Sequence, residues 1–326
     1  MCSLLITKIK IGGNMNTGMM DKTLLLTALL TAIAFSSCAP QSSNQNSPYQ
    51  DSNITDASSS NIVGGVLADA NFQKQNGIVQ LKIVSAQGVA TCTGSLIAPN
   101  LVLTAAHCIV DPTLKNVAVL FGLTDKGLSQ NQVIYAVSGS VNQNYDPNLT
   151  TASQNDIALL KLEKNAPADF KLAQLPGSQT VPSLKTGATL TFAGFGITNA
   201  IINKSVKDSS GRTRILSLPS TGSGTLRKVD NIVVTNIAAD QKEIALDQSK
   251  GKGACHGDSG GPAFLKQADG SNLLVGVTSR GTEKLGNCNV GVIYSSVVGQ
   301  LDWIKTESQK LLQPKTTEAT TTVAAK

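Results

Sequence analysis

The sequence predicts an all-β fold, and three observations support that prediction. Short runs rich in Val, Ile, Leu and Thr recur from residue 62 onward, separated by Gly, Pro, Asn and Asp. Within Ile78–Val84, apolar and polar side chains alternate with the period of a half-buried strand. No repeat of solenoid length and no glycine-rich phosphate-binding loop interrupts this pattern. Short apolar runs at such spacing are typical of a β-barrel or a β-sandwich.

The expected elements follow from these runs in chain order. Gly, Ser, Lys and Arg are frequent in Thr198–Ser223, which predicts a long surface loop. Apolar residues between Val297 and Leu312 fall roughly on one face of a helix that passes through Trp303, so the folded part is expected to end in a helix. The clearest expected strands are Ile78–Val84, Val117–Phe121, Val133–Val141, Ile157–Leu162, Ala188–Ala193, Ile232–Thr235 and Leu273–Thr278.

Composition excludes several other classes of protein. The chain has 326 residues, enough for about two folding units or one large one. Charged residues make up only 15%, which excludes a coiled coil and a charged disordered chain. Aromatic residues, at 4%, are too scarce for a base-stacking platform. The net charge of +6 is modest for this length, so nucleic acid is not an expected partner, and the basic stretch Lys204–Lys228 is interpreted as a solvated loop.

The N-terminal region has the layout of an export signal. Lys22 precedes the apolar run Leu24–Phe35, which is shorter than the ~18–20 residues that a membrane-spanning helix needs. Small residues follow the run, so residues 1–38 are interpreted as a secretory signal peptide, with Met15, Met19 or Met20 as the true start.

Cys38 refines this interpretation. Phe35-Ser36-Ser37-Cys38 resembles the lipobox of bacterial lipoproteins, with Phe35 where Leu is commonest, which implies lipidation of Cys38. Ordinary signal cleavage near Cys38 is the alternative. Residues 39–61 are rich in Ser, Asn, Gln and Asp and are expected to form a disordered tether or propeptide. The folded domain is then expected at residues 62–312, followed by a disordered tail at 313–326.

Six cysteines are present, and two of them, Cys2 and Cys38, belong to the N-terminal region. An even number of remaining cysteines in an exported chain predicts disulfides, for which three pairings are open. A zinc site is the alternative, but the chain has no Cys-x-x-Cys pair and only two histidines. The four remaining cysteines are Cys92, Cys108, Cys255 and Cys288.

Any histidine base must be His107 or His256. His107 follows an apolar run that ends in small residues, where a packed structural histidine is the alternative. His256 lies in a stretch rich in Gly, where a glycine-rich hairpin corner is the alternative.

The residues after His256 suggest nucleophilic chemistry. A serine becomes a nucleophile when a histidine removes its proton and an acid orients that histidine. Ser259 lies among glycines, so the backbone N–H groups of Gly257 and Ser259 could approach a developing oxyanion. Asp156 enters an apolar run and needs a partner if it is buried, although a turn residue at a strand end is the alternative.

Together these segments resemble the trypsin/chymotrypsin family of serine endopeptidases, over about Ile62 to Leu312. The resemblance implies two packed antiparallel six-stranded β-barrels with the reacting residues in the cleft between them, and a C-terminal α-helix. Lesser matches are Gly194-Phe195-Gly196, Ser279-Arg280-Gly281 and Asp302-Trp303-Ile304. The four principal motifs are Ile62-Val63-Gly64-Gly65, Thr104-Ala105-Ala106-His107-Cys108, Asp156-Ile157-Ala158-Leu159-Leu160 and Gly257-Asp258-Ser259-Gly260-Gly261-Pro262.

The resemblance implies a role for each matching residue. Ser259 would be the nucleophile, His107 the general base and then acid, and Asp156 the residue that orients His107. The N–H groups of Gly257 and Ser259 would form the oxyanion hole, and Ser279 would support Asp156. The implied disulfides are Cys92–Cys108 and Cys255–Cys288, and His256 is then not the base.

The resemblance also implies activation by cleavage. A new ammonium group at Ile62 would pair with Asp258 inside the domain. Asn61 stands where the family usually has Arg or Lys, so an unrelated protease or self-cleavage is expected to make the cut.

Five positions, one of them Ser279, bear on the substrate pocket through the same resemblance. Gly253 stands at the pocket floor, where trypsin-like enzymes carry Asp, so Arg or Lys specificity is not expected. Gly281 and Gly291 would keep the pocket walls open for a medium or large apolar residue. Arg280 replaces a Trp near the substrate strand, which leaves an acidic preference as the alternative.

The sequence therefore predicts an exported serine endopeptidase, secreted or anchored to a bacterial envelope through Cys38 alone. Its expected partners are protein or peptide substrates and an activating protease. It is expected to be a monomer without cofactor or metal. A non-catalytic binding module on the same fold and a structural envelope lipoprotein are the alternatives.

Overall fold

The computed structural model describes residues 62–86, 88–109, 116–177 and 184–313. The expected signal peptide, the lipidation site Cys38, the tether and the C-terminal tail lie outside these residues. Among the described residues, none of the helices has the length and apolar character needed to cross a membrane.

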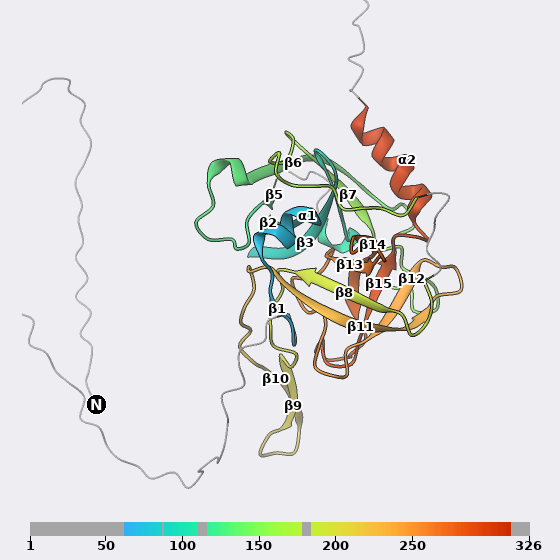
Figure 1. Cartoon of the computed structure of the whole chain (residues 1–326). Helices are drawn as coiled ribbons and strands as arrows, with labels where there is room; N and C mark the ends of the chain where they lie inside the picture. The colour runs from blue at the N-terminus through green and yellow to red at the C-terminus, as the bar shows by residue number, and fades with distance from the viewer. Residues whose placement is uncertain (1–61, 87, 110–115, 178–183, 314–326) are drawn as a thin grey trace, which may run out of the picture. The chain divides into compact units, whose positions relative to one another are not determined.

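The first half of the described chain forms a closed antiparallel barrel of six strands (Figure 1). Its core contains large aliphatic side chains with no exposed surface, such as Leu81, Leu103 and Leu160. In order around the barrel, the strands are β2 (Ile78–Ser85), β3 (Gly88–Ala98), β4 (Leu101–Thr104), β7 (Ala158–Leu162), β6 (Val133–Val141) and β5 (Val117–Leu120).

The second half forms another six-stranded barrel, which the pairing of β11 with β8 closes. The short strand β1 (Val66–Leu67) extends this sheet beside β11. In the core, the rings of Phe192 and Tyr294 stack with their centroids 4.5 Å apart. The barrel strands are β8 (Thr189–Gly194), β11 (Arg227–Ile237), β12 (Glu243–Asp247), β15 (Gly291–Ser296), β14 (Asn272–Gly281) and β13 (Pro262–Lys266). The predicted fold of two antiparallel six-stranded barrels is confirmed.

Helices are few. The helix α1 (Ala70–Gln75) was not predicted from the sequence. Asp69 caps it by accepting a hydrogen bond from the Phe72 N–H at 2.7 Å. Short 3-10 helices cover Ala106–Cys108 and Gln130–Gln132. The predicted C-terminal helix is α2 (Leu301–Leu312), which buries Leu301 and Ile304.

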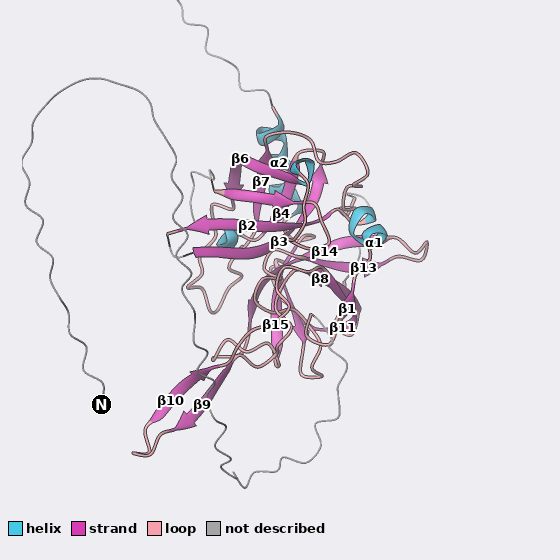
Figure 2. Ribbon diagram, turned by 90° about the vertical axis from the view of Figure 1, so that its left-hand side faces the viewer, coloured by secondary structure: helices cyan, strands magenta, loops and turns pink. Residues whose placement is uncertain are grey.

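Two local predictions are wrong. The alternation within Ile78–Val84 predicts an exposed polar face that includes Gln80, but Gln80 is fully buried. The expected loop Thr198–Ser223 contains a hairpin, in which β9 (Asn203–Lys207) pairs with β10 (Thr213–Ser217) and extends away from the barrels (Figure 2). Most of its side chains are exposed, so the hairpin shows no apolar alternation that could have revealed it.

Thr93 joins the two barrels next to the predicted site. Its backbone N–H donates to the carbonyl of Ser259 at 2.8 Å, and its hydroxyl donates to the carbonyl of Gly257 at 3.0 Å. The same hydroxyl accepts the Phe195 N–H at 3.1 Å. A strand of the first barrel therefore fixes the loop of the second barrel that carries Ser259.

Candidate active site

His107 lies in the 3-10 helix directly after β4, at the edge of the first barrel. Its backbone N–H donates to Oδ1 of Asp156 at 2.9 Å, and its Nδ1 lies 2.7 Å from Oδ2 of the same carboxylate. These two contacts fix both the backbone and the ring of His107 relative to Asp156. With Nδ1 bound to the carboxylate, Nε2 is the ring nitrogen left for a reacting group.

Asp156 is 2% exposed and precedes β7. The Ser279 hydroxyl donates to Oδ2 of Asp156 at 2.6 Å. Burial raises the pKa of Asp156, but the hydrogen bonds from His107 and Ser279 outweigh burial and hold this pKa below its ordinary value. The carboxylate is therefore ionised at neutral pH and can stabilise a positive charge on His107.

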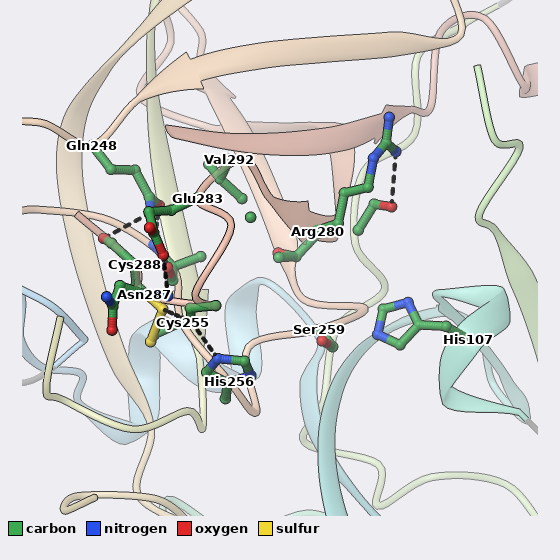
Figure 3. Close-up of a pocket in the computed structure, with 15 residues that line it drawn as sticks. His107, Gln248, Cys255, His256, Ser259, Arg280, Glu283, Asn287, Cys288 and Val292 are labelled. Carbon is green, nitrogen blue, oxygen red and sulfur yellow. Dashed lines mark hydrogen bonds between the residues drawn. A yellow bond between two sulfur atoms is a disulfide. The ribbon is translucent and has the colours of Figure 1, made fainter. Parts of the chain in front are cut away.

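Ser259 lies in the loop between β12 and β13, and it lines the same pocket as His107 (Figure 3). The loop depends on glycine. Gly260 has a φ of 78°, and a side chain there would overlap the Thr104 hydroxyl. A tight backbone thus presents Ser259 at the junction of the two barrels.

Two N–H groups of this loop point to an anion site. Within the loop, Asp258, Gly260 and Gly261 donate backbone hydrogen bonds to other carbonyls. In the described part of the chain, the backbone N–H groups of Gly257 and Ser259 donate no hydrogen bond. Gly257 has a φ of 98° and packs against Gly196, where a side chain would crowd its neighbour. Two free donors beside a serine suit a developing oxyanion.

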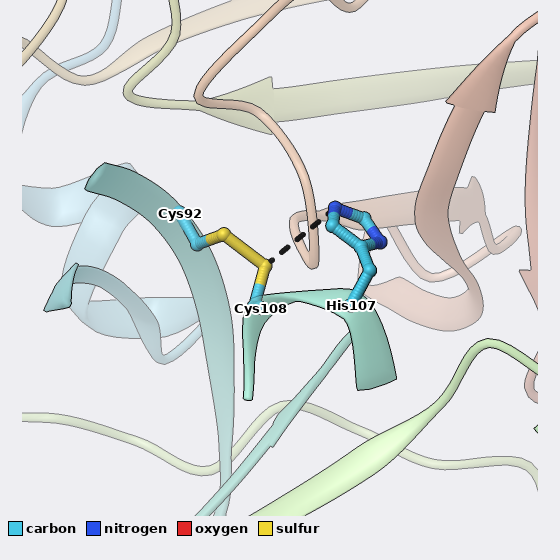
Figure 4. Close-up of side chains that lie close together, drawn as sticks. All are labelled: Cys92, His107 and Cys108. Carbon is cyan, nitrogen blue, oxygen red and sulfur yellow. Dashed lines mark hydrogen bonds between the residues drawn. A yellow bond between two sulfur atoms is a disulfide. The ribbon is translucent and has the colours of Figure 1, made fainter. Parts of the chain in front are cut away.

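Both implied disulfides are present next to these residues. Cys92 bonds Cys108, which follows His107, and Cys255 bonds Cys288. Figure 4 shows the first bond beside His107, whose Nε2 lies 3.8 Å from Sγ of Cys108. Each histidine therefore has two cysteine sulfurs nearby, but all four sulfurs are oxidised, so they cannot act as the thiolate ligands of a zinc site.

Asp258 is a buried carboxylate without a cation in contact among the described residues. Its oxygens accept the backbone N–H groups of Gly196 and Cys255, each at 2.8 Å. Burial raises its pKa to about 7, although both hydrogen bonds and the more distant Arg227 lower it. The side chain of Ile62 is fully buried in the second barrel, and Val63 pairs with Gly253. The described contacts do not join Ile62 to Asp258.

A pocket of about 280 Å³ opens beside Ser259 and His107. Of the residues expected to shape it, Ser279, Arg280 and Gly281 line the pocket, whereas Gly253 and Gly291 do not. Two residues that sequence reasoning missed, Gln248 and Val292, line it instead (Figure 3). The sequence around Gln248 and Val292 has no recognisable motif, so only the folded structure identifies them as pocket residues.

Arg280 lines the same pocket, but its charge is paired. Its guanidinium makes two parallel hydrogen bonds to the Glu243 carboxylate, at 2.8 and 2.9 Å. Glu243 also accepts the Gln154 N–H at 2.8 Å, which holds it in place. Because Glu243 already binds the Arg280 guanidinium through two hydrogen bonds, this positive group is not free to bind an acidic substrate residue.

Comparison with known proteins agrees with this arrangement. The trypsin family model matches residues 62–304. Chymotrypsin of Phaedon cochleariae is 30% identical over 236 residues, which are 71% of this chain and 77% of the relative. Brachyurin of Leptuca pugilator is 28% identical over 258 residues, 76% of this chain and 98% of the relative. The solved structure of HL collagenase superposes with a TM-score of 0.59 at 25% identity, over 76% of this chain and 99% of that chain. The chain belongs to the trypsin family of serine proteases.

Proposed function

We propose that this chain is an active serine endopeptidase that cleaves proteins or peptides through Ser259, His107 and Asp156. The observation that carries the proposal is the chain of hydrogen bonds from Ser279 to Asp156 to His107, in a pocket that Ser259 also lines. A binding module needs no such ionised and oriented pair. The family's protease relatives support protein substrates.

The proposed reaction uses these residues as follows. Ser259 Oγ attacks the scissile carbonyl carbon while Nε2 of His107 takes the hydroxyl proton. The N–H groups of Gly257 and Ser259 bind the oxyanion, and Asp156 stabilises the imidazolium. His107 then protonates the leaving amine, so the C–N bond breaks and an acyl-enzyme remains. A water molecule, deprotonated by His107, attacks the ester, and Ser259 recovers its proton as the acid product leaves.

Activation is part of the proposal. Asp258 lies in the loop that must present the two N–H donors, and in the uncleaved chain it is buried without a contacting cation among the described residues. Cleavage between Asn61 and Ile62 would create an ammonium group on a residue whose side chain is already docked in the second barrel. Because Asn61 is not basic, the activating protease would not be trypsin-like.

Export and domain boundaries complete the proposal. We assign residues 1–38 to a signal peptide, with lipidation at Cys38, residues 39–61 to a tether or propeptide, residues 62–312 to the protease domain and residues 313–326 to a tail. Two disulfides agree with folding in an oxidising compartment. The protease would act as a monomer, without a cofactor or nucleic acid, and favour apolar over basic residues before the scissile bond.

The test compares four purified proteins on a denatured protein substrate, with fragments separated by mass. They are the full chain, a chain that begins at Ile62, and the Ser259→Ala and Ser271→Ala variants of the latter. We expect cleavage only by the chain that begins at Ile62 and by the Ser271→Ala control, whose half-buried serine lies outside the pocket, directly before β14. Equal cleavage by the Ser259→Ala variant would contradict the assigned nucleophile. Folded protein without any cleavage would favour a binding module.

A further inference from the structure

Gln248 lies at the pocket because β12 and β15 are neighbours. The register pairs Asp247 with Gly291, and the N–H of Gln248 donates to the carbonyl of Val290 at 3.0 Å. Gln248 thus leaves the end of β12 beside the strand that carries Val292. Figure 3 shows these two side chains across the pocket from His107 and Ser259.

The Gln248 amide is fixed in this position. The side chain is 1% exposed, and its Nε2 donates to the carbonyls of Ala254 and Cys288, both at 3.1 Å. Its Oε1 accepts the N–H of Ala254. The amide therefore bridges two pocket walls that the Cys255–Cys288 disulfide also joins. Because this buried amide is fully hydrogen-bonded, it forms a fixed and uncharged bottom of the pocket.

The same amide replaces a side chain at position 253. A Cβ atom on Gly253 would overlap Oε1 and Cδ of Gln248, so the two positions share one space. The expected floor position is consequently filled by a neutral group from the start of the same loop, directly after β12. This explains why Gly253 does not leave an open, deep pocket.

Val292 narrows the pocket from a second side. It is 3% exposed and pairs with Gly281 across β14 and β15. Gly281 has no side chain to project, whereas the isopropyl group of Val292 lines the pocket. The expected open wall at Gly291 is therefore occupied by its neighbour.

The charges around the pocket do not favour a charged substrate residue. Arg280 is bound by Glu243, as described above. Glu283 accepts the backbone N–H groups of Leu285 and Asn287, at 2.8 and 2.9 Å, so its carboxylate is turned to its own loop. At the base of the pocket, an ammonium or guanidinium group would meet the Gln248 amide and the Val292 isopropyl group, whereas the pocket-lining Glu283 carboxylate already accepts two N–H groups of its own loop.

We infer that Gln248 is a specificity-determining residue that, together with Val292, limits the depth of the pocket. The substrate class is then a peptide with a small or medium apolar residue, such as Ala, Val or Leu, before the scissile bond. Larger aromatic side chains and Lys or Arg are disfavoured. This inference rests on the proposed protease function and names the substrate class of that same site.

The experiment compares peptides that differ only in the residue before the scissile bond, either Leu, Phe or Lys. We expect kcat/KM for Leu to exceed that for Phe in the chain that begins at Ile62. Gln248→Ala should lower the Leu-to-Phe ratio at least about tenfold, because a hydrophobic pocket gains about this much from newly accommodated methylene groups. Gln248→Met keeps the length but loses the hydrogen bonds, so it should retain the original ratio.

If the Gln248→Ala variant does not fold, Val292→Ala tests independently whether the depth of the pocket sets the Leu-to-Phe ratio. It should shift the ratio in the same direction, whereas Val290→Ala, the same change at an exposed position outside the pocket, should not. A starting preference for Phe or Lys would overturn the inference. So would an unchanged ratio in folded Gln248→Ala and Val292→Ala variants.

Active-site titration with a fluorophosphonate distinguishes a failure of the role of Gln248 from a failure of the proposed protease function. A variant that labels fully but keeps its ratio contradicts only the role of Gln248. A chain that begins at Ile62, is folded and does not label contradicts the proposed protease function itself.

Discussion

At the scale of single residues, Asp156 shows how burial and hydrogen bonding combine. Burial alone would favour the protonated acid, but three contacts from His107 and Ser279 favour the carboxylate and lower its pKa. The sequence predicted its role through the resemblance of the motif that begins at Asp156, because the need of a buried acid for a partner still left a turn residue as the alternative. It could not predict that Arg280 is paired with Glu243, since those residues meet only in the folded barrel.

Asp156→Asn tests the role of this carboxylate. An amide can hold His107 through its N–H and thereby fix the wrong tautomer, so we expect kcat to fall by about 10⁴, the factor known for this change in another protease of the same family. Steady-state kinetics, normalised by active-site titration, measure this loss. Asp269→Asn, on an exposed turn, is the matched control and should keep full activity. A loss below tenfold would exclude Asp156 as the orienting acid.

The Arg280–Glu243 pair gives a second prediction at this scale. We expect Arg280→Trp to leave the relative cleavage of peptides with acidic residues unchanged within about twofold, because Glu243 already neutralises the guanidinium. Glu243→Gln keeps an acceptor for Gln154 but removes the charge, so it should raise cleavage of acidic peptides several-fold. Peptide profiling measures both. A loss of acidic cleavage in Arg280→Trp would instead support the acidic preference.

At the scale of elements, the hairpin β9–β10 is attached to a wall of the pocket. Oδ1 of Asn287 accepts the N–H groups of Ile202 and Asn203, both at 2.9 Å, and its Nδ2 donates to the Asn203 carbonyl at 3.0 Å. Asn287 precedes Cys288 and lines the pocket. The base of the hairpin therefore helps to fix that wall.

Asn287→Ala should loosen this wall. It leaves two N–H groups and a carbonyl without their partner, each costing about 1–3 kcal/mol if it stays buried. We expect KM to rise about tenfold with kcat within about threefold, because the wall holds substrate but does not react. Shortening the hairpin within 205–215, which keeps Asn203, should change neither constant. A drop in kcat with an unchanged KM would contradict a role in substrate binding.

At the scale of the whole molecule, the site exists only because two barrels meet. His107 and Asp156 come from the first barrel, and Ser259 and Ser279 from the second. Contiguous motifs made these four residues predictable, as alternating apolar runs did for most strands. The hairpin β9–β10 was not predictable, because its exposed strands show no alternation of apolar and polar residues. The place of Gln248 at the bottom of the pocket was not predictable either, because it depends on the register of β12 with β15.

The proposed activation predicts that the stability of the uncleaved chain depends on pH through Asp258. The pKa of Asp258 is about 7 in the uncleaved fold, above its ordinary value, so between about pH 4 and pH 7 the folded state binds a proton that the unfolded state has lost. Its contribution to the free energy of unfolding therefore falls as pH rises through this window.

Urea unfolding of the full chain between pH 4 and pH 8 measures this contribution by comparison with Asp258→Asn. We expect the fall to vanish in Asp258→Asn and to be smaller in the chain that begins at Ile62, where an ammonium group can pair with the carboxylate. Identical pH profiles for the full chain and its Asp258→Asn variant would contradict the buried, unpaired state of Asp258.

A covalent label shows whether His107 activates Ser259. The folded chain that begins at Ile62 is treated with a fluorophosphonate, and the adduct is located by peptide mass spectrometry. We predict one adduct on Ser259 that is lost in His107→Ala. No adduct on Ser259 in folded protein with both disulfides formed, or equal labelling in His107→Ala, would contradict the account.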